Sequence, residues 1–122
     1  MNIHESAEDY LEMILILKQR LGQVRSIDIV NEMDYSKPSV SVAMKKLREN
    51  GYISVDGSGY IDLNESGLKI ANYVYDRHQS ITAFLMKIGV TKVVAAEDAC
   101  KIEHDISSET FQKIKEFIND CT

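Results

Sequence analysis

The order of apolar and polar positions along the chain predicts a mostly helical protein. From residue 5 to residue 21 the apolar residues recur every three or four positions, the spacing that gathers side chains on one side of an α-helix. Met13 and Ile16 add apolar positions outside that stripe, so more than half of the circumference is apolar. Such a helix is buried on several sides, including against a second subunit. The main stripe consists of Ala7, Tyr10, Leu11, Ile14, Leu17 and Leu21.

Two shorter helices follow, joined by a tight connection at residues 34–36. The pattern predicts the first at residues 26–33, capped by Ser26. Ser36 caps the second, Pro38 lies in its first turn, where a missing N–H costs nothing, and Asn50 with Gly51 closes it. The inward positions are Ile27, Val30 and Met33 on the first helix and Val40, Ala43, Met44 and Leu47 on the second.

Two β-prone runs, residues 52–55 and 60–63, flank an Asp-Gly turn and predict a hairpin. Asn64 then caps a long helix that runs to about residue 86, and helices at residues 92–104 and 107–119 complete the chain, the last capped by Ser107. The inward stripe of the long helix is Leu68, Ala71, Val74, Tyr75, His78, Ile81 and Leu85. This order predicts a mainly α fold, a winged helix-turn-helix at residues 1–63 followed by a helical domain at residues 64–122.

Composition narrows the class of protein. The chain has 122 residues, of which 44% are apolar, enough for one compact unit or two small ones and too many for a disordered chain. Its polar, acidic start is not a signal peptide, and its apolar runs are too short to span a bilayer. Cys100 and Cys121 form neither a CxxC pair nor a disulfide framework. We therefore expect a cytoplasmic protein without a membrane partner, and assign no role to His4 or Cys121.

The charges are unevenly distributed, although the net charge is −5. Residues 36–50 carry four cations and one anion, whereas residues 97–109 carry five anions and one cation. A recognition helix needs small or polar residues at its start, to approach base edges, and cations further along for phosphates. Val42 on that polar face suits a thymine methyl group. The predicted DNA contacts are Ser36, Lys37, Pro38, Ser39, Ser41, Val42, Lys45 and Lys46, with Arg25 before the first short helix and Ser58 at the wing tip. The alternative is a winged-helix domain used for protein contacts.

Six side chains with metal-ligating groups stand at suggestive spacings. Cys100, Glu103 and His104 lie at i, i+3 and i+4, which places a thiolate, a carboxylate and an imidazole on one helix face. Asp9 and Glu12 form a second i, i+3 pair, and His78 lies on the inward stripe of the long helix. Carboxylate and imidazole ligands suit Mn²⁺, Fe²⁺ or Zn²⁺, and a thiolate favours softer ions. Spacing alone leaves open a core histidine, a solvated acidic helix and a small buried cysteine.

The chain is not expected to be an enzyme. It contains no HExxH motif, no nucleophile elbow and no glycine-rich phosphate loop. A six-donor site built entirely from protein would leave little room for a small-molecule substrate. A winged-helix transcription regulator that needs no metal is the alternative function that the residues leave open.

Five stretches resemble the diphtheria toxin repressor family, and more closely its manganese-regulator branch. They are SAEDYLEMI, SKPSVSVAMKKLRENGYI, LNESG, DRHQSITAFL and EDACKIEHDIS, and together they span nearly the whole chain. The resemblance implies a homodimeric repressor that binds Mn²⁺ or Fe²⁺, with Zn²⁺, Co²⁺ or Cd²⁺ as substitutes, and then occupies palindromic operators in double-stranded DNA beside metal-uptake genes. Residues 64–122 would be the metal-binding and dimerisation domain.

The same resemblance implies a two-metal site. One ion would be held by Asp9, His78, residue 100 and Glu103, and the other by Glu12, Glu103, His104 and the main-chain carbonyl of residue 100. The chain departs from the branch at Cys100, where manganese regulators usually have glutamate and iron regulators have cysteine. Iron regulators usually have methionine at the position of Asp9, and their ancillary site is not matched by Thr82 and Ala96. The ligand set is therefore a hybrid of the two branches.

Overall fold

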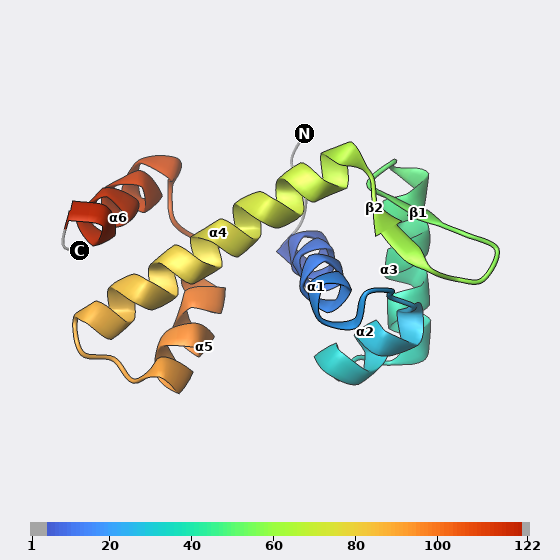
Figure 1. Cartoon of the computed structure of the whole chain (residues 1–122), viewed down its shortest axis with the longest axis horizontal. Helices are drawn as coiled ribbons and strands as arrows, with labels where there is room; N and C mark the ends of the chain where they lie inside the picture. The colour runs from blue at the N-terminus through green and yellow to red at the C-terminus, as the bar shows by residue number, and fades with distance from the viewer. Residues whose placement is uncertain (1–4, 121–122) are drawn as a thin grey trace. The chain divides into compact units, whose positions relative to one another are not determined.

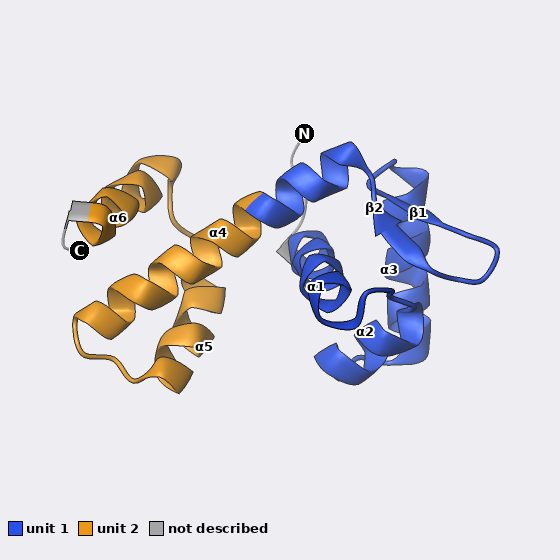
Figure 2. Ribbon diagram, in the orientation of Figure 1, with its two compact units in different colours: residues 1–72 blue, residues 73–122 orange. Residues whose placement is uncertain are grey.

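The computed structural model describes residues 5–120 and confirms a mainly helical fold with a single hairpin in that part of the chain (Figure 1). His4 and Cys121 lie outside the described residues. The chain divides into two compact units, Met1–Asn72 and Tyr73–Thr122, with the boundary inside α4 (Figure 2). The elements are α1 (Glu5–Leu21), α2 (Ser26–Met33), α3 (Lys37–Glu49), β1 (Ile53–Val55), β2 (Ile61–Leu63), α4 (Glu65–Lys87), α5 (Lys92–Ile102) and α6 (Ser108–Asp120).

The first unit is built around an apolar core to which α1, α2, α3 and both strands contribute. β1 and β2 pair antiparallel, with Ile53 opposite Leu63 and Val55 opposite Ile61. The hairpin is attached to the segment before α2, because the Ile61 N–H donates to the Val24 carbonyl at 2.7 Å. The fully buried side chains of this core include Leu11, Ile14, Leu17, Val24, Ile29, Val40, Ile53 and Ile61.

The helix-turn-helix connection is made as the sequence predicts. Asp34 takes the left-handed conformation (φ 57°), and its N–H donates to the Val30 carbonyl at the end of α2. Ser36 then caps α3 by accepting a hydrogen bond from the Ser39 N–H at 3.2 Å, and Pro38 lies in the first turn. Val40, Met44 and Leu47 are buried, so the predicted inward stripe of α3 is confirmed at these three positions.

Several local expectations in this unit were wrong. The N-cap of α2 is Arg25 rather than Ser26, and the Arg25 N–H donates to the Asp28 carboxylate at 2.9 Å. Ile29 fills the core where Ile27 was expected, because the helix is rotated to place Ile29 inward, and Ile27 is 42% exposed. The leading residue of each predicted strand lies outside the ladder. The Tyr52 backbone bonds to Leu47 of α3 and to Asn64, and Tyr60 belongs to the turn. Leu21 and Leu68, both expected to face inward, are exposed.

Two ion pairs connect elements of the first unit. Lys18 on α1 pairs with Asp62 on β2, and Arg20 on α1 pairs with Glu32 on α2 at 2.7 Å. The hydrogen bond from Arg20 lowers the pKa of the Glu32 carboxyl. Both pairs are well exposed, so screening by water and salt keeps their contribution to stability small.

The second unit is built around Ile81 of α4, Ala99 of α5 and Phe111 of α6. Arg77 donates to the Ile106 carbonyl at 2.8 Å and lies over the Phe111 ring, which attaches the α5–α6 connection to α4. Ser107 accepts a hydrogen bond from the Thr110 N–H, so its predicted capping role is confirmed. α5 ends two residues earlier than expected, at Ile102, and Glu103 is its C-cap. Among the described residues, no helix combines the length and the apolar character that crossing a membrane requires.

Candidate nucleic-acid interface and metal-binding residues

The outer face of α3 is exposed and carries the residues expected to contact DNA. Pro38 and Val40 belong to opposite sides of the helix, and only Val40 is buried. Val42 is 54% exposed and adds an apolar side chain to this otherwise polar face. The exposed residues of this face and its cap are Ser36, Lys37, Pro38, Ser39, Ser41, Val42, Lys45 and Lys46.

The hairpin and the start of α2 form a second exposed element. The Arg25 guanidinium lies over the Tyr60 ring, 4.4 Å from its centroid, which holds the arginine against the wing. At the turn, the Asp56 carboxylate accepts hydrogen bonds from the Ser58 and Tyr60 N–H groups, both at 2.9 Å. These bonds leave Ser58 exposed at the tip, as expected from the sequence.

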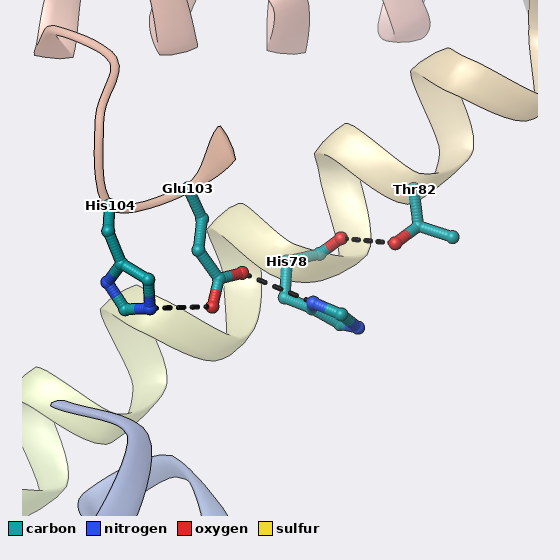
Figure 3. A network of polar contacts seen from close by, with 4 residues as sticks. All are labelled: His78, Thr82, Glu103 and His104. Atoms are coloured by element: carbon teal, nitrogen blue, oxygen red, sulfur yellow. Dashed lines mark hydrogen bonds and ion pairs between the residues drawn. The ribbon is translucent and has the colours of Figure 1, made fainter. Parts of the chain in front are cut away.

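A polar network in the second unit joins three residues with metal-ligating groups (Figure 3). Glu103 lies between two imidazoles: its Oε2 is 3.2 Å from His78 Nδ1, and its Oε1 is 3.5 Å from His104 Nε2. The side chain of Glu103 is 1% exposed and that of His104 is 4% exposed, whereas His78 is 25% exposed. A nearly dry carboxylate flanked by two imidazoles is a donor set that suits a divalent cation.

The hydrogen bonding of one atom in this network indicates whether a cation would fit. Glu103 Oε1 is buried, and within the described part of the chain it receives no hydrogen bond. The nearest nitrogen, His104 Nε2, is 3.5 Å away, which is too far for a good hydrogen bond, so burial of this oxygen is costly and a coordinated cation would satisfy it. The residues of the second unit therefore fit a divalent metal ion.

The other three predicted ligands lie on α1 and α5. Asp9 is half-buried and Glu12 is buried, an uncommon state for an acidic residue. Cys100 is an exposed cysteine on α5, whereas Glu103 follows that helix and is buried. α5 ends at Ile102, so Glu103 and His104 lie just beyond the helix rather than within it, but the ligating atoms of Cys100 and Glu103 still lie within 4.8 Å of one another.

Two further residues, which the sequence does not point to, help to hold the polar network in place. The Thr82 hydroxyl donates to the His78 carbonyl at 2.7 Å, one turn along α4, and so holds the backbone beside the imidazole (Figure 3). In the sequence, Thr82 is apparent only as a mismatch to the ancillary site of iron regulators. Arg77 anchors the loop that follows Glu103 and His104. In the sequence, the role of Arg77 is indicated only by its position directly before His78.

Comparison with known proteins identifies both parts of the chain. Residues 2–60 match a family model described as "Iron dependent repressor, N-terminal DNA binding domain". Residues 64–122 match a model described as "Iron dependent repressor, metal binding and dimerisation domain". These descriptions confirm the expected class, a transcriptional repressor and not an enzyme, and they assign DNA, a divalent metal and dimerisation to this family.

Individual relatives agree with the family models. An HTH-type transcriptional regulator of Methanocaldococcus jannaschii is 32% identical over 116 residues, covering 93% of each chain. The transcriptional regulator MntR of Escherichia coli is 32% identical over 113 residues, covering 93% of this chain and 73% of the relative. The solved structure of the manganese regulator SloR is 29% identical with a TM-score of 0.81, and this chain spans 55% of it. The chain belongs to the iron-dependent repressor family, whose members are metal-dependent, DNA-binding transcriptional repressors.

Proposed function

We propose that this chain is a homodimeric repressor, activated by Mn²⁺ or Fe²⁺, that binds palindromic operators of metal-uptake genes in the cytoplasm. The observation that carries the proposal is the buried Glu103 carboxylate between His78 and His104, inside the part of the chain that matches the metal-binding domain. Residues 1–63 would bind DNA, and residues 64–122 would bind metal and dimerise. Zn²⁺, Co²⁺ and Cd²⁺ would act as substitutes.

The proposed ligands are the six residues identified from the sequence. His78, Glu103 and His104 belong to the network described above, and Asp9, Glu12 and Cys100 complete the set by resemblance to the family. The bound cation would supply positive charge to a set that contains three carboxylates. Without it, repulsion among these acids disfavours the arrangement that ligation requires. Because α1 shares a core with α3, ligation through Asp9 and Glu12 would couple the ligand set to the DNA-binding helix.

The proposed interface with DNA follows from the exposed face of α3. Ser39, Ser41 and Val42 would approach base edges, with Val42 against a thymine methyl group, and Lys45 and Lys46 would meet phosphates. Arg25 and Ser58 would contact the flanking backbone. In a twofold dimer the two copies of α3 would enter successive major grooves, about 34 Å apart, which requires a palindromic operator.

The first prediction is that metal raises DNA affinity. Titrating Mn²⁺ or Fe²⁺ into the protein with a fluorescent palindromic operator should tighten DNA binding by about 5–150-fold, the usual range of coupling between two sites. By linkage, operator DNA should tighten metal binding by the same factor. Fluorescence anisotropy measures the first effect and isothermal calorimetry the second. DNA affinity that is constant across the titration would instead identify a metal-independent winged-helix regulator.

Two variants distinguish the residues that bind DNA from those that bind metal. Lys45→Ala/Lys46→Ala should lose DNA affinity for every sequence, with a salt dependence shallower by about one unit of slope per lysine, and should retain metal binding. Lys101→Ala is the matched control, since this exposed lysine lies on α5. If both variants lost DNA affinity equally, the proposal that α3 contacts DNA would be contradicted.

The second prediction concerns the residue that departs from the manganese branch. Cys100→Glu replaces a soft thiolate by a hard carboxylate, so activation should move toward Mn²⁺ and away from Zn²⁺ and Cd²⁺. Cys100 is exposed, so the change should leave stability nearly unaltered. The measurement is the order of metals in the anisotropy titration, together with calorimetric affinities. An unchanged order would show that residue 100 does not determine metal preference.

A further inference from the structure

Arg25 and Tyr60 form a contact between the start of α2 and the hairpin, and hydrogen bonds hold the main chain on both sides of it. The Arg25 guanidinium lies 4.4 Å from the centroid of the Tyr60 ring. Directly beside this pair, the Ile61 N–H donates to the Val24 carbonyl at 2.7 Å, which joins the two segments through their backbones. The Arg25 N–H donates to the Asp28 carboxylate at 2.9 Å, so the main chain of the arginine is held as well.

The turn of the hairpin fixes the backbone of Tyr60. The Tyr60 N–H donates to the Asp56 carboxylate at 2.9 Å, and the Tyr60 carbonyl accepts a hydrogen bond from the Asp56 N–H at 3.0 Å. Tyr60 is half-buried, whereas Arg25 is exposed. An exposed guanidinium therefore lies over a ring whose own position is set by the fold.

The N–H donors of the Arg25 side chain remain available to an anion. Among the described residues, no hydrogen bond or ion pair engages its guanidinium. Arg77 and Lys115 of the second unit also lie over aromatic rings, but they donate to the Ile106 carbonyl and the Asp76 carboxylate. A ring attracts the charge of a guanidinium without supplying a hydrogen-bond acceptor, so the planar fork can still bind a phosphate through two N–H groups.

We infer that Tyr60 is a positioning residue for DNA binding, whose ring holds the Arg25 guanidinium in place for a phosphate of the DNA backbone. The inference rests on the proposed function, in which Arg25 contacts DNA, and deepens it by naming the residue that orients this contact. An arginine already held against a ring loses less side-chain freedom when it binds a phosphate, so the ring raises affinity before DNA arrives. The charge of Arg25 releases counterions from DNA, whereas the ring of Tyr60 does not.

The test measures the affinity of the full chain for a fluorescent DNA duplex by anisotropy, at several salt concentrations and with Mn²⁺ held constant. Arg25→Ala should weaken binding and make the salt dependence shallower by about one unit of slope. Tyr60→Leu should weaken binding by about 2–5-fold, the factor expected for an exposed contact between a cation and a ring, with the slope unchanged. Tyr60→Phe is the matched control, because it keeps the ring, and should bind as the parent does.

A double-variant cycle decides whether Tyr60 acts through Arg25. Once residue 25 is alanine the ring has no guanidinium to hold, so Arg25→Ala/Tyr60→Leu should bind no more weakly than Arg25→Ala. Fully additive losses overturn the inference, since a damaged hairpin or a direct contact of Tyr60 with DNA would produce them. A Tyr60→Phe protein as weak as Tyr60→Leu overturns it too.

The same measurements separate this inference from the proposed function. An Arg25→Ala protein that binds as the parent does at every salt concentration counts against the proposed contact of Arg25 with DNA. A weakened Arg25→Ala protein beside a Tyr60→Leu protein that binds as the parent does counts against the positioning role of Tyr60 alone.

Discussion

Replacing Glu103 with glutamine should abolish most of the metal-dependent gain in DNA affinity. The carboxylate is 1% exposed and contacts both His78 and His104, so it lies at the centre of the proposed ligand set in the second unit. Glutamine keeps the shape of the side chain but removes the negative charge and one acceptor. We expect metal affinity to fall by at least the 10–100-fold typical of lost support around a metal, and the gain in DNA affinity to fall with it.

The matched control for Glu103→Gln is Glu97→Gln. Glu97 lies on α5 in the same acidic segment but is exposed, so its change alters the net charge equally without touching the network. Calorimetry with Mn²⁺ and anisotropy with operator DNA give the two readouts, and DNA binding without metal should be unaffected in both variants. If Glu103→Gln responds to metal as the parent does, the buried network is not the metal centre.

Gly67→Ala should destabilise the first unit strongly. A Cβ atom at this position of α4 would lie 2.1 Å from the Tyr52 carbonyl oxygen, a backbone atom that cannot move alone. That same oxygen accepts the Asn64 N–H, while the Asn64 and Ser66 side chains both donate to the Gly51 carbonyl. Relief of the clash must separate the start of α4 from the hairpin. The expected cost is about 1–3 kcal/mol, as for other overpacked sites, and each kcal/mol lowers Tm by about 4–8 °C in a unit of this size.

Gly57→Ala is the control for that prediction. Gly57 lies in the hairpin turn, a Cβ there meets nothing within 4 Å, and its backbone is not left-handed. Thermal and urea unfolding should therefore show little change at Gly57 and a large loss at Gly67. Equal stabilities in the two variants would mean that α4 can shift away from Tyr52 at little cost.

Much of the first unit could be predicted because its determinants are local. The bounds of α1 and α2 follow from a periodicity that repeats every turn, and Ser36 with Pro38 marks the start of α3 by short-range capping. The exposed face of α3 follows from the same helical periodicity, because the residues outside its buried stripe, Val42 and the lysines, point away from the core. The choice between Ile27 and Ile29 did not follow, since a helix of eight residues offers both as inward positions and the neighbouring helices decide between them.

For the candidate metal site, the sequence by itself determined which residue types are present and at what spacing, and the family resemblance grouped them. It could not determine that Glu103 follows α5 as a buried C-cap, or that its carboxylate approaches His78, because residues 25 positions apart meet only through packing. The requirement for glycine at position 67 likewise arises from a contact between segments that are distant in the sequence. Local pattern determines elements, since their hydrogen bonds are short-range, whereas only the tertiary structure decides which side chains meet across them.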